Sequence, residues 1–221
     1  QLHVVHDDPM ALLADGYAAL SGLLAPMTVR YGDQLRLAGT DLPRPERLRV
    51  PTRHGRVRVH VYRPPGVERP AIHVHLHGGA FMMRFPQMDD FFCRFVVAEA
   101  GVAVVNVDYL VAPRVRYPVA QEQTHDVLAW LTGHAGEWGL DADRISIGGF
   151  SGGGSLAASA CLQARDHATA SPRLQVLGVP SLDVAGDVHG KPSTIANPMI
   201  GPGLLRLVRA TYFNDVDRRR E

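Results

Sequence analysis

Hydrophobic and polar positions change their period twice along this chain. From Met10 to Leu24, apolar residues recur at helical spacing and form one apolar face. Residues 46–52 and 56–62 then flank a His54-Gly55 turn, and in the second of them apolar residues alternate with polar ones. Such a pattern predicts an antiparallel hairpin at a sheet edge.

After Pro65 the pattern changes to short apolar runs separated by longer helical stretches. Strands and helices in alternation are typical of a mostly parallel sheet covered by helices on both faces, so we predict an α/β fold. The expected strands are 71–76, 102–107, 144–148 and 174–179, and the expected helices are 88–100, 119–138 and 151–168. After Ser181 the pattern predicts no further strand.

Composition narrows the class of partner. The chain has 221 residues, 46% hydrophobic and 20% charged, with a net charge of +1, which is typical of a globular α/β domain. Balanced charge favours neither nucleic acid nor an anionic membrane surface, so we expect a small-molecule or protein partner. No signal peptide and no apolar run long enough for a membrane span is expected, which favours a cytoplasmic location. The two cysteines are expected to be reduced thiols.

The strongest motif is Gly149-Phe150-Ser151-Gly152-Gly153. It is a G-x-S-x-G placed directly after an expected strand and before an expected helix, which is the context of a nucleophile elbow. The turn holds the serine in a strained conformation that exposes its hydroxyl, and the helix N-terminus behind it favours negative charge. We predict Ser151 as a catalytic nucleophile; the alternative is a glycine-rich turn that only permits close packing.

A second motif, His77-Gly78-Gly79-Ala80-Phe81, ends the expected strand 71–76. Successive glycines at a strand end leave backbone N–H groups free to face a bound oxygen. Together with the N–H of Gly152, those of Gly78 and Gly79 are expected to form an oxyanion hole. The alternative is that the glycines only make a sharp turn.

These motifs resemble those of bacterial esterases similar to hormone-sensitive lipase. The resemblance covers about residues 54–183 and includes HGGAF, DYLVAPRVRYP at 108–118, GLDADRISIGGFSGGGSLAA at 139–158 and VPSLD at 179–183. It implies an α/β-hydrolase fold, hydrolysis of short- to medium-chain acyl esters and no cofactor. It also implies a helical cap partly built from the N-terminus, so we expect a cap segment at 1–45 and a core at 46–221.

Three residues depart from the family pattern. Ala80 replaces the third glycine usual in the first motif, which should be tolerated because Gly78 and Gly79 remain. Phe150 stands where an acidic or small polar residue is common before the serine. Arg114 replaces the glutamate usual after Ala-Pro. The last two affect the hydrogen bonding expected around the elbow.

The triad acid and histidine should follow Ser151 in the chain, and the family places them after two further strands that this pattern does not show. We therefore expect them beyond Glu221, in a longer enzyme. A substitute within the chain is Asp183 or Asp187 with His189, which follow the neighbouring strand. His167 is expected to be too remote, at the far end of the helix that Ser151 begins.

Three further hypotheses concern the site. His73, His75 and His77 share one strand face, which resembles the way metallohydrolases gather imidazoles, but the adjoining strand end has no carboxylate at a ligand-like spacing. The preferred interpretation is no metal, with His73 and His75 bonded to polar groups under a helix. An acyl pocket is expected to be lined by apolar residues after the glycine motif, namely Phe81, Met82, Met83, Phe85 and Met88. The alternative is that these residues belong to the hydrophobic core. A non-catalytic, hydrolase-like binding protein is the alternative function. The sequence leaves self-association open.

Overall fold

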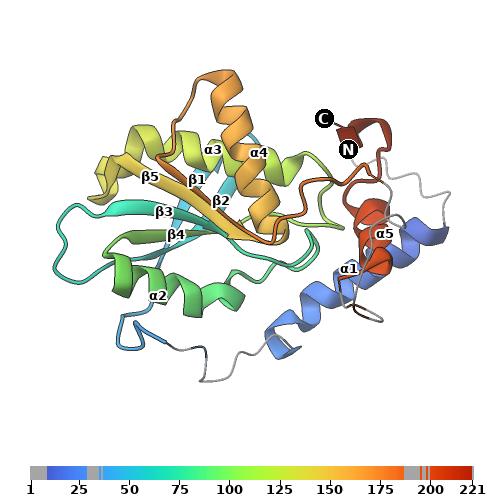
Figure 1. Ribbon diagram of the computed structural model, residues 1–221, viewed down its shortest axis with the longest axis horizontal. Helices are drawn as coiled ribbons and strands as arrows, with labels where there is room; N and C mark the ends of the chain where they lie inside the picture. Colours follow the sequence, from blue (N-terminus) through green and yellow to red (C-terminus); the bar gives the residue numbers. More distant parts are fainter. Residues whose placement is uncertain are drawn as a thin grey trace.

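A mixed sheet forms the centre of the molecule in the computed structural model, which describes residues 9–28, 35, 37–186, 195, 198 and 200–220 (Figure 1). The described strands lie in the order β1 (Glu46–Thr52), β2 (Gly55–Tyr62), β4 (Ala103–Asp108), β3 (Ala71–Leu76), β5 (Asp141–Phe150) and β6 (Leu174–Gly178). β1, β2 and β4 pair antiparallel, whereas β4, β3, β5 and β6 run parallel. The predicted hairpin at the sheet edge and the predicted strands are confirmed, with boundaries shifted by up to three residues.

Helices cover the two faces of the sheet, as predicted. α3 (Val119–His134) and α4 (Gly152–His167) pack together on one face, and α2 (Asp90–Ala100) lies on the other (Figure 1). Two short 3-10 turns adjoin helices: η2 (Pro86–Asp89) precedes α2 and η3 (Ala135–Trp138) follows α3. A third, η4 (Asp217–Arg220), lies near the C-terminus.

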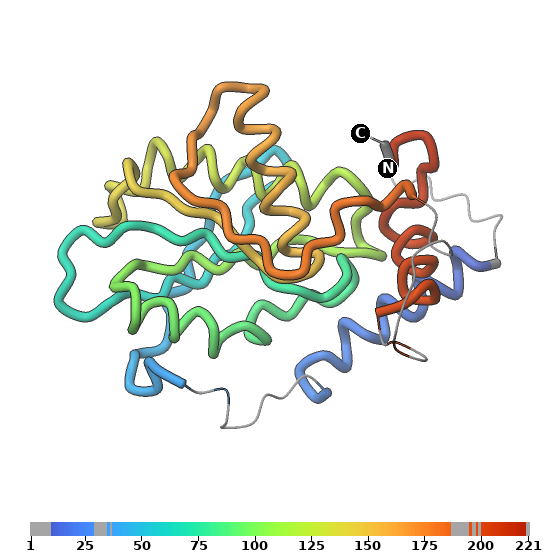
Figure 2. Tube along the Cα trace, in the orientation of Figure 1, coloured from blue at the N-terminus to red at the C-terminus, as the bar shows by residue number. Residues whose placement is uncertain are grey.

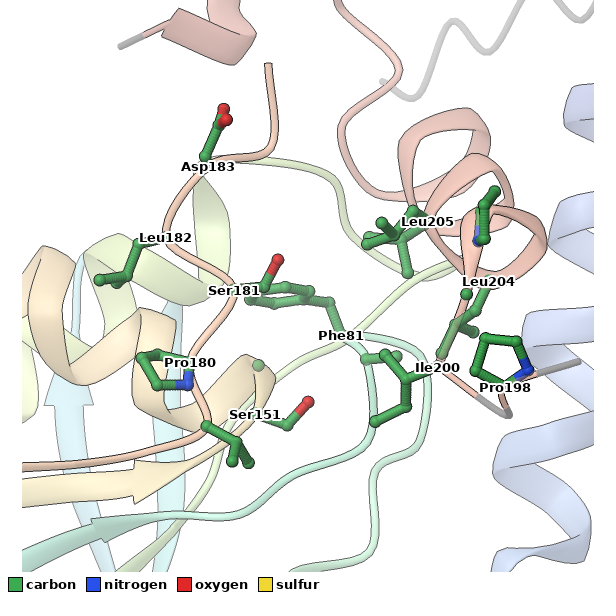
Figure 3. A pocket seen from close by; sticks show the side chains of 16 residues that line it. Phe81, Ser151, Pro180, Ser181, Leu182, Asp183, Pro198, Ile200, Leu204 and Leu205 are labelled. Atoms are coloured by element: carbon green, nitrogen blue, oxygen red, sulfur yellow. The ribbon is translucent and has the colours of Figure 1, made fainter. Parts of the chain in front are cut away.

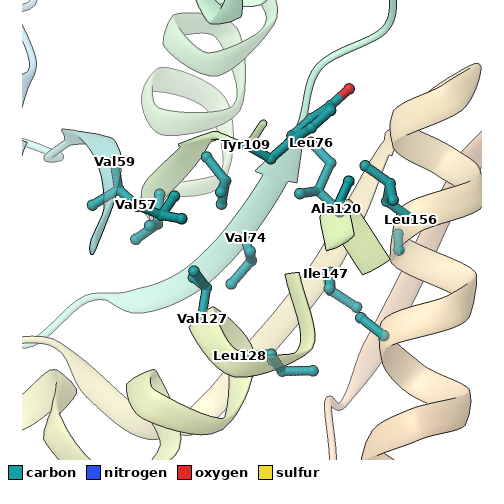
Figure 4. Close-up of a cluster of buried hydrophobic side chains, with 14 of the residues drawn as sticks. Val57, Val59, Val74, Leu76, Tyr109, Ala120, Val127, Leu128, Ile147 and Leu156 are labelled. Atoms are coloured by element: carbon teal, nitrogen blue, oxygen red, sulfur yellow. The ribbon is translucent and has the colours of Figure 1, made fainter. Parts of the chain in front are cut away.

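The core lies between the sheet and the pair α3 and α4. Every residue of β4 is buried, which is why this strand shows an almost continuous apolar run. In β2 the side chains of Val57 and Val59 are buried and the intervening Arg58 is exposed, as the alternation predicted. Figure 4 shows Val74 and Ile147 of the sheet packing toward α3 and α4.

Two helices from opposite ends of the chain lie side by side beyond the sheet. α1 (Pro9–Thr28) confirms the predicted N-terminal helix, and α5 (Pro202–Thr211), which was not among the expected helices, packs against it (Figure 2). The expected boundary between a cap at 1–45 and a core at 46–221 stays a prediction.

α1 contains an apolar stretch longer than we expected from the sequence. Its span Met10–Thr28 is long and apolar enough to cross a membrane by length and composition, a test that the core helix of a soluble protein and a signal sequence also pass. Its Asp15 accepts hydrogen bonds from Arg116 and from Thr211 of α5. In the structure this helix therefore has polar contacts that fix it to the rest of the protein.

Candidate active site

Ser151 lies in the tight turn between β5 and α4, as the elbow motif predicted. Its backbone has φ 52° and ψ −119°, and its N–H donates to the Gly178 carbonyl at 2.8 Å. Positive φ is unusual for a residue with a side chain and marks a conformation that the surroundings impose. Gly149 and Gly153 permit it, because a Cβ on either one would collide with the Leu76 carbonyl of the neighbouring strand.

The glycine motif after β3 lies directly opposite this turn. A Cβ on Gly78 would lie 3.9 Å from the Ser151 Cβ, and a Cβ on Gly152 would lie 3.3 Å from the Phe81 N. Gly79 has φ +117°, and its carbonyl accepts from the Met83 N–H at 2.9 Å. Gly78 therefore lies beside Ser151, Gly152 directly follows it, and Gly79 lines the same cavity. Their role as oxyanion donors stays a prediction.

The N–H groups of these glycines are available to a ligand. None of the backbone hydrogen bonds in the described turns and loops is donated by Gly78, Gly79 or Gly152. Gly152 is also the first residue of α4, where an N–H has no partner inside the helix. Donors of this kind beside a serine hydroxyl can stabilise an oxygen that becomes negatively charged.

His77 shapes the glycine loop from beneath. Its Nδ1–H donates to the Gly78 carbonyl at 2.6 Å, and its ring stacks on Tyr109 at 4.3 Å between centroids. The Tyr109 hydroxyl donates to the His77 carbonyl at 2.6 Å. Burial lowers the pKa of His77 to about 4, so its ring is neutral near pH 7 and serves as a structural donor.

Two cavities meet at Ser151. One of about 370 Å³ lies toward Phe81, residues 179–183 and α5; Figure 3 shows the Ser151 hydroxyl pointing toward it. The other, of about 530 Å³, lies toward α1 and the start of α2. Of the residues expected to line an acyl pocket, Phe81 lines the first cavity and Met82, Met83 and Met88 the second, while Phe85 lines neither.

Of the substitute triad, Asp183 lies within the described residues. Asp183 lines the smaller cavity, but its Oδ1 accepts from the N–H groups of Ala185 and Gly186 at 3.1 and 2.7 Å. Figure 3 shows its carboxylate directed away from Ser151. Asp187 and His189 lie outside the described residues.

The histidines of β3 have separate contacts. His73 Nδ1 lies 3.0 Å from the Ser146 hydroxyl, and His75 Nε2–H donates to Asp89 Oδ2 at 2.8 Å beneath α2. The prediction that both bond to polar groups under a helix is confirmed, and the partner of His75 is a carboxylate from outside the adjoining strands. Asp89 is fourteen residues further along the chain, and the turn η2 returns it to the sheet. Within the described part of the chain, no three His, Cys, Asp or Glu side chains are placed to hold a metal ion.

Sequence reasoning missed several lining residues. The larger cavity is also lined by Tyr17 and Ser21 of α1, by Asp89, by Ile200 and by Leu204 of α5. Leu204, Leu205 and Val208 recur at helical spacing after Gly201-Pro202, a signal from which α5 could have been predicted.

Comparison with known proteins shows which proteins this chain is similar to. A family profile described as alpha/beta hydrolase fold matches residues 73–221. An ethyl acetate hydrolase of Pseudomonas putida is 37% identical over 144 residues, which cover 62% of this chain and 45% of that protein. Carboxylic ester hydrolase LipN of Mycobacterium tuberculosis is 32% identical over 182 residues, which cover 80% of this chain and 46% of that protein. The chain thus spans a little under half the length of these two curated relatives.

Solved structures agree with the sequence comparison. An esterase from Pyrobaculum calidifontis superposes with a TM-score of 0.77 and 26% identity, covering 100% of this chain and 69% of that one. A bacterial heroin esterase superposes with a TM-score of 0.76 and 28% identity, and the match covers 93% of this chain and 68% of that one.

Proposed function

Because this chain belongs to the α/β-hydrolase fold family of esterases similar to hormone-sensitive lipase, we propose that it is a serine carboxylesterase that cleaves short- to medium-chain acyl esters. The observation that supports this most directly is the strained Ser151 at the strand-to-helix turn, facing two cavities and three unused backbone donors. The relatives named above are described as hydrolases of carboxylic esters.

In the proposed mechanism, the Ser151 hydroxyl attacks the ester carbonyl and loses its proton to a histidine that follows it in the chain. The carbonyl oxygen takes up the negative charge and accepts hydrogen bonds from the N–H groups of Gly78, Gly79 and Gly152. The alcohol then leaves with a proton, giving an acyl ester on Ser151. Water hydrolyses that ester, releases the acid and restores the serine.

Replacement of the serine tests this function. In the full-length protein, which would carry the triad histidine, we expect Ser151→Ala to lower kcat/KM for p-nitrophenyl acetate and butyrate by about 10³-fold or more, because the nucleophile of a catalytic triad is worth at least that much. Ser159→Ala, a matched change further along α4, should retain wild-type activity. Undiminished turnover by a folded Ser151→Ala protein would contradict the serine mechanism.

One observation favours the alternative of a non-catalytic binding protein. Among the described residues that line the two cavities there is no histidine, so no imidazole base faces Ser151 within that part of the chain. A binding protein would take up esters and return them unchanged. Saturable ester binding by calorimetry, with no acid released over many hours by the protein or by a longer chain, would favour this alternative.

A further inference from the structure

The larger cavity beside Ser151 contains a buried charge. Asp89 lines it although the side chain is only 4% exposed, and it is the single charged residue among the described residues of the lining. The surrounding wall is mostly apolar, with methionine and phenylalanine side chains. A carboxylate in such surroundings is costly unless it is hydrogen-bonded.

His75 fixes one side of this carboxylate. The His75 side chain is fully buried, and its Nε2–H donates to Asp89 Oδ2 at 2.8 Å. The imidazole ring is flanked by the rings of Phe92 and Phe150, with centroids 5.0 and 5.6 Å away. Phe150, the departure from the family pattern next to Ser151, therefore helps to hold the orientation of His75 and, through it, of Asp89.

The other carboxylate oxygen has no donor in the described part of the chain, which leaves it available to a ligand in the cavity that Asp89 lines. Within the described part of the chain, Oδ1 of Asp89 accepts no hydrogen bond. Polar atoms that are both unpaired and closed to solvent do not include this oxygen, so it is accessible to solvent. The next residue differs. Asp90 accepts from the Tyr62 hydroxyl at 2.9 Å and from Arg94 Nε at 2.8 Å, and it does not line the cavity.

We propose that Asp89 determines substrate specificity by selecting esters that carry a hydrogen-bond donor, a hydroxyl or an ammonium group, on the part of the ester that fills this cavity. The inference rests on the proposed esterase function. The donor reaches Asp89 Oδ1 while the ester carbonyl lies at Ser151. An ester that ends in a methyl group there covers the carboxylate and gives it no donor, which is why sites built for a hydroxyl discriminate strongly against analogues without one.

The test compares esters in matched pairs. One series places a terminal hydroxyl on acyl chains of increasing length in methyl esters, and a second places it on the alcohol chain of acetates. Each hydroxy ester is paired with the methyl-terminated ester of the same number of heavy atoms. We expect kcat/KM to favour the hydroxyl by about tenfold or more in one series. That series identifies which half of the ester occupies the cavity.

Two asparagine variants separate Asp89 from its neighbour. In Asp89→Asn, the His75 donor should hold the amide oxygen and turn the NH₂ group toward the cavity, so the acceptor becomes a donor. We expect the preference for hydroxy esters to fall by at least about tenfold. Asp90→Asn removes the same charge one residue away, outside the cavity, and should keep the preference.

The outcomes distinguish this inference from the proposed function. Equal kcat/KM for every pair would overturn the role of Asp89 and leave the esterase function standing. Loss of the preference in Asp90→Asn but not in Asp89→Asn would also overturn it. If no ester were cleaved, titration calorimetry with uncleaved amide analogues still decides. Tighter binding of the hydroxy amide that Asp89→Asn abolishes supports the role of Asp89, and equal binding of the two amides overturns it.

Discussion

The backbone of Ser151 is shaped by residues other than Ser151. A non-glycine residue at positive φ costs about 1–3 kcal/mol, and it is retained only where the surrounding structure compensates. Here Gly149 and Gly153 let the elbow approach Leu76 more closely than any side chain would allow, and Gly178 accepts the Ser151 N–H. The exposed hydroxyl is therefore a consequence of packing between three neighbouring elements.

The glycine loop offers a direct test of the proposed oxyanion donors. Proline at Gly79 removes one N–H and cannot adopt φ +117°. We expect Gly79→Pro to lower kcat for short-chain esters by about 10²-fold or more, since one oxyanion donor is worth roughly 10² to 10³. Gly133→Ala, at a position with open space around it, should retain activity. Wild-type turnover by a folded Gly79→Pro protein would remove this loop from the mechanism.

The contrast between Ser151 and Asp89 shows what the sequence could predict at the site. Both glycine motifs follow strands of one parallel sheet, so their meeting at the carboxyl edge of the sheet could be predicted from order alone. The pairing of His75 with Asp89 could not, because it depends on how the η2 turn folds back beneath α2. Tertiary contacts of this kind have no periodic signal in the sequence.

The packing of α1 on α5 depends on a small polar network. Arg116 Nη2–H donates to Asp15 Oδ2 at 2.5 Å, and Arg116 Nη1–H donates to the Thr211 hydroxyl at 2.9 Å. The Thr211 hydroxyl donates in turn to Asp15 Oδ1 at 2.5 Å. These bonds connect both helices to the loop before α3. Because Tyr17 and Leu204 line the larger cavity, the network also positions one wall of the site.

Removing Arg116 should loosen this wall. Each partner is mostly buried, and loss of a charged hydrogen-bonding group in such a place costs about 1–3 kcal/mol. We expect Arg116→Ala to speed amide hydrogen exchange in α1 by roughly tenfold or more, at about 1.4 kcal/mol per factor of ten. Arg114→Ala, an exposed arginine two residues earlier, is the control. Equal exchange in both variants would show that apolar packing alone holds α1.

Most of the regular elements were predictable because burial on one face leaves a period of two or about 3.6 in the sequence. α5 was not expected although its apolar residues recur at helical spacing, because glycines and prolines precede this short segment and arginines interrupt it. Its burial arises from contact with α1, nearly 190 residues away in the chain. Element boundaries differed by a few residues, as at β5, which begins at Asp141.

The two edges of the sheet differ in how they are protected. β1 has Arg47, Arg49 and Pro51, which discourage a further strand from pairing. β6 pairs with β5 on one side, and no strand of the described chain pairs with its other side. Leu174 and Val176 on β6 are exposed. An apolar, unpaired edge of this kind is a surface on which other chains can associate.

A charge on β6 should therefore reduce association. We expect the 221-residue chain to form larger species as its concentration rises, and Val176→Lys to shift them toward monomer in analytical ultracentrifugation. Leu162→Lys, which adds the same charge at an exposed position on α4, should have little effect. If Val176→Lys associated as readily as the wild-type chain, the β6 edge would not be the contact surface.

Covalent labelling tests the role of Ser151 most directly. Diethyl p-nitrophenyl phosphate transfers its diethylphosphoryl group to an activated serine and releases p-nitrophenol. We expect one phosphoryl group per protein, located by peptide mass spectrometry on Ser151 and accompanied by loss of esterase activity. Ser151→Ala should remain unlabelled. If the protein hydrolysed esters while Ser151 stayed unmodified, or were inactivated by labelling elsewhere, Ser151 would not be the nucleophile.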